Sequence, residues 1–116
     1  MDPDTEIARL TGRDGFYIDQ LQFIMRNGES SPQLGGTGGS ADDFTLLEDE
    51  SVRKVIIRTG DFLDSARFIT NKGNEYKFGG NGGRVEFIVY VPFGFNLAGF
   101  KITTVEWVRS LGLIFK

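Results

Sequence analysis

The chain has 116 residues, of which 40% are hydrophobic, and a formal net charge of −3. This length fits a single domain with one hydrophobic core, and the acidic balance argues against a surface that binds nucleic-acid phosphates. Cysteine and histidine are both absent, so the chain lacks disulfides, thiolate chemistry and the most common catalytic base and metal ligand. We therefore expect a domain that is not an enzyme and that holds no cofactor and no metal.

Alternating apolar residues predict β-strands along the first unit, at about residues 6–47. Alternation from Leu21 to Met25 predicts a half-buried strand that ends at the Asn27-Gly28 turn. A short strand over Ser30–Leu34, the glycine loop Gly35–Gly39 and a strand through Phe44 and Leu46 are expected to follow.

The second unit, at about residues 52–91, repeats this plan. Its predicted strands run through Val55 and Ile57, through Ala66, Phe68 and Thr70, over Glu75–Phe78, and through Val85, Phe87, Val89 and Val91 on one face. The glycine loop Gly79–Gly83 lies between the last two. The third unit, at about residues 97–116, contains two predicted strands, one through Leu97, Phe100 and Ile102 and one through Leu111, Leu113 and Phe115. No segment has a sustained helical period.

Two segments share one motif, Arg13–Ile24 and Arg58–Ile69, and their glycines Gly15 and Gly60 lie 45 positions apart. Arg, Gly, Asp and a Phe-Ile pair occupy matching positions in both segments. Apolar residues outside the motif keep the same register in all three units, as at Leu10, Val55 and Phe100. In the third copy, Val105 and Arg109 stand where the Gly and the Asp would be.

These internal repeats predict an all-β fold with pseudo-threefold symmetry, formed by one domain over residues 1–116. Each unit alone would expose an apolar sheet face, and three such faces packed around a common axis bury one another. The third unit has two predicted strands where the others have four. We therefore expect an incomplete third sheet, with a second copy of the chain or a segment of a larger parent protein pairing at its edge.

A single Gly-x-x-x-Asp motif is most often a tight turn in which the Asp side chain bonds the turn amides. Here the motif occurs twice, and each copy is followed by a Gly-Gly-x-Gly-Gly loop. With Gly15–Asp19 and Gly35–Gly39, and again with Gly60–Asp64 and Gly79–Gly83, nearly the whole chain resembles the jacalin-related lectins. This resemblance implies a β-prism of three Greek-key sheets with sugar sites in the loops at one end.

The resemblance also implies which residues bind carbohydrate. The motif Asp would accept hydrogen bonds from sugar hydroxyls, which suits an ionised carboxylate, and backbone N–H groups of the turn and of the loop glycines would donate. Aromatic turn residues would pack on the C–H face of a sugar. The candidate residues are Gly15, Phe16, Tyr17, Asp19, Gly38 and Gly39 at one site, and Gly60, Asp61, Phe62, Asp64, Gly82 and Gly83 at the other.

The third motif departs from the family pattern at Val105 and Arg109, and no glycine loop precedes it as it does in family members. Galactose-specific members depend on a processed N-terminal glycine, which the chain lacks, so the resemblance favours mannose- or glucose-type glycans. The alternative is a β-prism protein-interaction or structural module that has lost sugar binding, such as the targeting domain of a larger, pore-forming protein.

Other features have simpler interpretations. Trp107 is interpreted as a rim aromatic, and Asp42-Asp43 with Asp49-Glu50 as solvated turn acids rather than a calcium site. No apolar run reaches the roughly 20 residues of a membrane span. The N-terminus does not resemble a signal peptide, and no glycosylation sequon occurs. These features favour a cytosolic location unless the chain is a domain excised from a larger protein.

Overall fold

The computed structural model describes residues 6–31, 34–35, 38–60, 62–104 and 108–116, and these contain strands but no helix. The predictions made for Asp61, Val105 and Trp107 fall outside these residues. The strands of the first unit are β1 (Ile7–Asp14), β2 (Ile18–Met25), β3 (Leu34–Gly35) and β4 (Ser40–Thr45). Those of the second are β5 (Val52–Thr59), β6 (Leu63–Thr70), β7 (Glu75–Gly79) and β8 (Val85–Tyr90). The third unit forms β9 (Leu97–Thr104) and β10 (Val108–Phe115).

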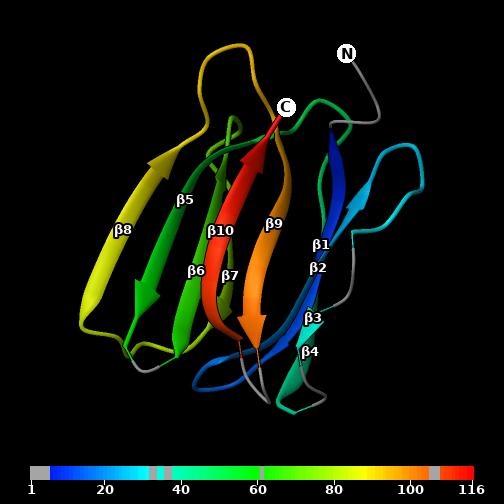
Figure 1. Cartoon of the computed structure of the whole chain (residues 1–116). Helices are drawn as coiled ribbons and strands as arrows, with labels where there is room; N and C mark the ends of the chain where they lie inside the picture. The colour runs from blue at the N-terminus through cyan, green and yellow to red at the C-terminus, as the bar shows by residue number, and fades with distance from the viewer. Residues whose placement is uncertain (1–5, 32–33, 36–37, 61, 105–107) are drawn as a thin grey trace.

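Each unit forms its own antiparallel sheet, as the repeats predict. The strand order is β3-β2-β1-β4 in the first sheet and β7-β6-β5-β8 in the second, so the two have the same topology. The third sheet has the order β10-β9 within the described residues. The three sheets surround a common axis, which confirms an all-β prism (Figure 1).

The pseudo-threefold symmetry is visible in how the sheets meet. The inner strands β2, β6 and β10 lie against one another at the centre of the prism. At the corners, β7 of the second sheet lies against β1 of the first, and β3 of the first lies against β9 of the third. Each of these two sheets therefore sets an outer strand against a strand of a neighbouring sheet.

Residues that recur at the repeat period form the core. Leu10 and Val55 are fully buried, and so are Phe23 and Phe68, whose rings meet edge to face with centroids 5.7 Å apart. Such aromatic contacts add to the free energy gained by burying apolar area. Gly12 stands where the second unit has Ile57, and a methyl group on Gly12 would lie 2.4 Å from the Gln20 carbonyl oxygen.

Both ends of the expected strand over Ser30–Leu34 pair with β2, and residues 32–33 lie outside the described residues. Ser30 forms an isolated bridge with Ile24, and β3 comprises only Leu34 and Gly35.

The interpretation of Glu50 as a solvated turn acid is wrong, because this side chain is buried. Its carboxylate accepts hydrogen bonds from the Thr70 hydroxyl at 2.6 Å, the Asn74 amide at 2.7 Å and the Tyr76 hydroxyl at 3.0 Å. Burial alone would raise the pKa of Glu50, but these bonds and one from the Leu47 N–H outweigh it and lower the pKa to about 2. Glu50 thus ties the β4–β5 connection to the β6–β7 hairpin.

Candidate functional site

The two intact motifs fold into turns with the same hydrogen bond. The Gly15 N–H donates to the Tyr17 carbonyl at 3.0 Å, and the Gly60 N–H donates to the Phe62 carbonyl at 3.0 Å. These turns join β1 to β2 and β5 to β6 at the same end of the prism (Figure 1). Each turn places the motif Asp as the second residue of the following strand.

The structure brings each motif carboxylate together with its glycine loop. A methyl group on Gly38 would lie 3.1 Å from Asp19 Oδ1, and one on Gly82 would lie 3.1 Å from Asp64 Oδ1. Asp19 is 7% exposed and Asp64 is 5% exposed. In both units a nearly buried carboxylate therefore lies close to the glycine loop. Because glycine has no side chain, the backbone N–H groups of the loop stay accessible at close range.

The last glycine of each loop has a backbone conformation that other residues rarely adopt. The φ angle is 69° at Gly39 and 100° at Gly83. A side chain at Gly39 would also lie 2.6 Å from Asp19 Oδ2, and one at Gly83 would lie 3.1 Å from Asp64 Oδ2. Glycine is thus required here both for the turn and for the approach to the carboxylate.

The motif arginines hold the glycine loops in place, a role that the sequence analysis did not assign. Arg13 donates from Nε to the Gly38 carbonyl at 3.0 Å and from Nη2 to the Gly39 carbonyl at 2.9 Å. Arg58 donates from Nη2 to the Gly83 carbonyl at 3.0 Å. The signal was the recurrence of Arg two positions before each motif glycine.

Burial and hydrogen bonding suit the Asp19 and Asp64 carboxyl groups to accept hydrogen bonds from a ligand. Burial raises the pKa of the Asp19 carboxyl, and the positive charge of Arg13 opposes this rise. Asp64 Oδ2 is buried and has no hydrogen-bond partner among the described residues. A buried carboxylate oxygen without a donor is costly, and a ligand hydroxyl would satisfy it.

Asp14 is a second residue that the sequence analysis missed. Its Oδ2 atom accepts a hydrogen bond from the Gly79 N–H at 2.5 Å, which links the first unit to the start of the second glycine loop. Burial and a hydrogen bond with Asp42 raise the pKa of Asp14 to about 6. Thr59 occupies the matching position of the second unit, so no repeat marked Asp14.

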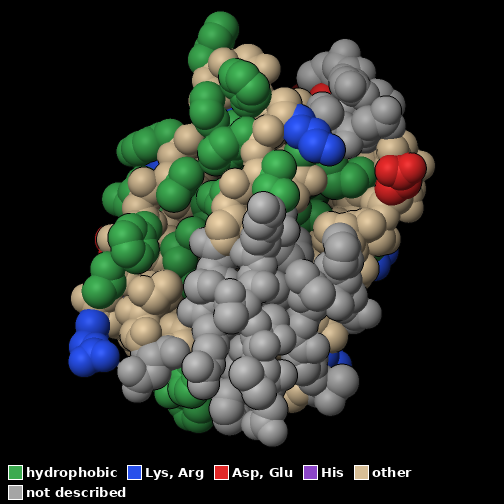
Figure 2. All heavy atoms as spheres, viewed as in Figure 1, with side chains coloured by type: hydrophobic (Ala, Val, Ile, Leu, Met, Phe, Trp, Pro, Cys, Tyr) green, Lys and Arg blue, Asp and Glu red, His purple; other side chains and the backbone are tan. Residues whose placement is uncertain are grey.

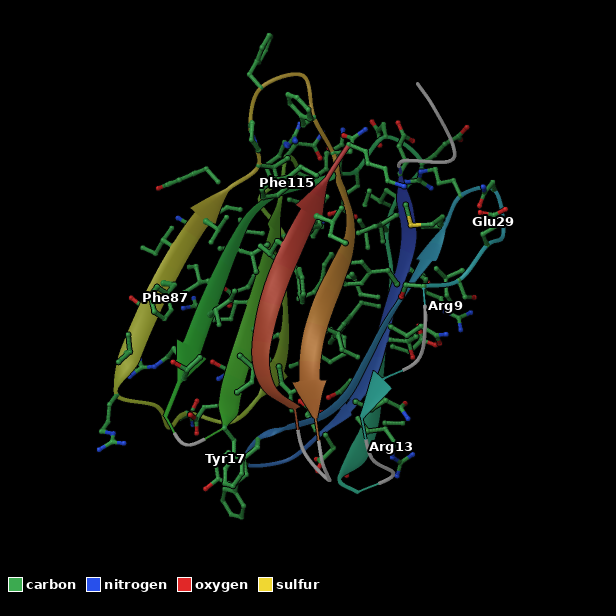
Figure 3. All side chains as sticks on the ribbon, in the orientation of Figure 1. Arg9, Arg13, Tyr17, Glu29, Phe87 and Phe115 are labelled. Atoms are coloured by element: carbon green, nitrogen blue, oxygen red, sulfur yellow. The ribbon has the colours of Figure 1, made fainter. Side chains whose placement is uncertain are left out.

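The remaining predicted residues line the same end. A methyl group on Gly60 would lie 3.2 Å from Asp64 Oδ2, whereas Gly15 has open space around it. Phe16 is 87% exposed, Tyr17 is 37% exposed, and Tyr17 meets Phe62 edge to face with ring centroids 5.1 Å apart. Figure 3 shows Tyr17 at this end of the prism.

The described residues show neither a metal site nor a membrane-spanning helix. No group of three or more Asp, Glu, His or Cys side chains gathers there as a metal site would require. None of those residues forms a helix long and apolar enough to cross a membrane.

Comparison with known proteins identifies relatives of the whole chain. The family model of the jacalin-like lectin domain matches residues 1–114. A Schizosaccharomyces pombe protein that carries the name of a zinc metalloproteinase is 33% identical over 105 residues, which are 88% of this chain and 16% of that protein. The chain thus spans only a small part of that relative.

Solved structures share the fold at low identity. A prostate-specific glycoprotein lectin, WGA16, superimposes with a TM-score of 0.86 at 24% identity, covering 99% of this chain and 85% of that one. Artocarpin in complex with mannotriose gives a TM-score of 0.85 at 20% identity, covering 97% of this chain and 84% of that one. Both likenesses cover almost the full length, so the prism architecture is shared throughout.

Proposed function

The chain belongs to the family of jacalin-like lectin domains, and we propose that it binds mannose- or glucose-type glycans through two sites, one at Asp19 and one at Asp64. Carbohydrate binding is the general property of a lectin domain. The finer proposal concerns which sugars bind and which residues hold them.

One observation carries this proposal, the duplication of a buried carboxylate beneath a glycine loop. A methyl group on the loop would lie 3.1 Å from an Oδ1 atom in both units. In each site the carboxylate would accept two hydroxyl hydrogens of one sugar, and backbone N–H groups of the turn and the loop would donate to the same hydroxyl oxygens. Such sites are shallow and hydrated, so we expect weak affinity for a single sugar.

We propose no catalytic activity for this chain. The sequence contains neither histidine nor cysteine, and no constellation of acid and base side chains stands out in the described residues. The metalloproteinase name belongs to a relative of which the chain matches 16%. In a protein of that length, a domain like this one would bring the other parts of the polypeptide to glycan-bearing surfaces.

A glycan array tests the proposal. The wild type should bind mannose- or glucose-containing glycans, and the double variant Asp19→Ala, Asp64→Ala should not. The matched control is Asp43→Ala, Asp49→Ala, which removes the same charge from two exposed carboxylates. If the array shows no carbohydrate binding, or if both double variants bind like the wild type, the site assignment is wrong.

A second candidate function, self-association, is favoured by the incomplete third sheet. In the first two sheets, the inner strand β2 or β6 pairs with an outer strand that lies against a neighbouring sheet. By the same symmetry, a strand beside β10 would lie over β5 and β8. Among the described strands, none occupies this position.

The inner face of β8 shows what such a strand would cover. Phe87 pairs with Ile57 and so shares its face, yet Phe87 is 53% exposed while Ile57 is 5% exposed. On the same face of β4 in the first sheet, the Phe44 ring, which corresponds to Val89 of β8, is covered by Tyr76 and Phe78 of β7, with ring centroids 5.2 Å apart in both pairs. Figure 2 shows hydrophobic side chains gathered over β8 and β5.

We propose that β10 of a second copy covers this face in a twofold dimer. In such a dimer the two β10 edges would pair across the twofold axis, and each β10 would cover the inner face of β8 in the other copy. A single interface would therefore pair the exposed edge and bury the exposed apolar face of both copies.

Light scattering after size exclusion should give a dimer for the wild type and a monomer for Phe87→Lys. Ile88→Lys is the matched control, because Ile88 is 50% exposed on the opposite face of the same strand. A wild-type chain that stays monomeric at high concentration would overturn this candidate.

A further inference from the structure

We infer that the two proposed sites form one continuous edge that binds an extended oligosaccharide, with Phe16 and Tyr17 lying between the two sugar-binding carboxylates. This inference rests on the proposed function and specifies its ligand, a glycan chain long enough to occupy both sites at once.

The turn of the first site contacts both the motif turn and the glycine loop of the second site. The Tyr17 ring meets the Phe62 ring of the second motif turn, with centroids 5.1 Å apart. The Phe16 backbone lies against the second glycine loop, since a methyl group on Gly80 would lie 2.6 Å from the Phe16 carbonyl oxygen. The turn of the first site therefore lies against both the motif turn and the glycine loop of the second site.

This turn presents an aromatic surface. Phe16 is 87% exposed and its neighbour Tyr17 is 37% exposed, so two adjacent aromatic side chains are open to solvent on this turn. A pyranose ring has apolar C–H faces that stack well on such rings. A sugar that lies between the two carboxylates would therefore rest on Phe16 and Tyr17, while its neighbours in the glycan chain engage Asp19 and Asp64.

Contacts between the two units hold the sites at a fixed spacing. The Asp14 carboxylate accepts a hydrogen bond from the Gly79 N–H at 2.5 Å, and this bond joins the end of β1 to the end of β7. The Tyr17–Phe62 contact joins the two motif turns. Because the spacing is built into the fold, a chain that fits it would bind the second site without a further cost of ordering the protein.

A preorganised pair of weak sites gains affinity from linkage. Once one sugar of an oligosaccharide is bound, another sugar of the same oligosaccharide is held at a high effective concentration near the second site. We expect affinity to rise on the order of tenfold or more at the chain length that spans both sites. At the same length, the number of ligands bound per protein chain should fall from two to one.

Isothermal titration with methyl α-mannoside and linear α-linked manno-oligosaccharides of two to five sugars tests this inference. Phe16→Ala should lower the affinity for the spanning oligosaccharide more than that for methyl α-mannoside. In Asp64→Asn, the spanning oligosaccharide should bind no more tightly than methyl α-mannoside. The matched control is Phe93→Ala, because Phe93 is fully exposed in the β8–β9 connection, at the opposite end of the prism, and the variant should keep the full gain (Figure 1).

The outcomes separate this inference from the proposed function. If methyl α-mannoside binds at two sites and affinity per ligand does not change with chain length, the continuous edge is overturned while the two sites stand. If Phe16→Ala and Phe93→Ala keep the same gain, the aromatic bridge is overturned. Absence of wild-type binding to both methyl α-mannoside and methyl α-glucoside overturns both proposals.

Discussion

Asp64→Asn separates the two roles that a buried motif carboxylate can have. The substitution keeps the size of the side chain but replaces one carboxylate oxygen with an NH2 group, which only donates. Asp64 is 5% exposed, and its Oδ2 atom has no partner among the described residues. Loss of this acceptor should therefore affect a bound sugar far more than the fold.

The expected magnitudes have opposite signs. A hydrogen bond to a charged group contributes about 1.5–3 kcal/mol, so affinity at this site should fall about 10- to 150-fold. A buried polar atom without a partner costs about 1–3 kcal/mol. The ligand-free variant should therefore be at least as stable as the wild type, because a neutral amide without a partner costs less to bury than a carboxylate oxygen without one.

Titration with methyl α-mannoside measures the first effect, and urea denaturation without ligand measures the second. Stoichiometry should fall from two to one in Asp64→Asn, and likewise in Asp19→Asn. Wild-type binding by Asp64→Asn would refute the assignment of this site. A loss of more than about 1 kcal/mol in unfolding free energy, with unchanged binding, would show that the carboxylate only braces its turn.

Three further predictions follow from other contacts. Gly82→Ala places a methyl group 3.1 Å from Asp64 Oδ1 at a residue without positive φ, so sugar binding should weaken about tenfold or more while the melting temperature changes little; a lower melting temperature with intact binding would contradict this. Arg13→Met frees the carbonyls of Gly38 and Gly39, so titration should show weaker binding at the first site only; equal weakening at both sites would argue against a local clamp. The pKa of Glu50 lies at about 2 instead of 4.5, so the wild type should lose about 3 kcal/mol of unfolding free energy as pH falls from 4.5 to 2. Glu50→Gln should lack this loss in denaturation measured across that range, and an unchanged pH dependence would rule out Glu50 as its source.

The architecture was predictable because the repeat constrains long-range pairing. Residues such as Leu10 and Val55 recur at one spacing, and each unit had to bury the same face. The repeat also predicted a third sheet with two strands, which the described residues confirm. It did not predict that the inner face of β8 stays exposed at Val85 and Phe87, because burial there depends on a strand from another part of the prism.

The site was predictable only as far as its repeated parts. The Asp and Gly positions recur, and the structure brings them together in both units. Asp14 and Glu50 act through partners that are distant in the sequence, such as Gly79 for Asp14, and each occurs in one unit only. Turn acids are usually solvated, so a buried one becomes recognisable only when the folded chain supplies its donors.

Nuclear magnetic resonance with methyl α-mannoside tests the central claim, two equivalent sites at one end of the prism, most directly. Saturating sugar should shift two groups of backbone amides, those of residues 16–19 with 38–39, and those of residues 62–64 with 82–83. Asp19→Asn should abolish the first group of shifts alone, and Asp64→Asn the second alone. Shifts confined to one group in the wild type, or found mainly outside both groups, would contradict the account.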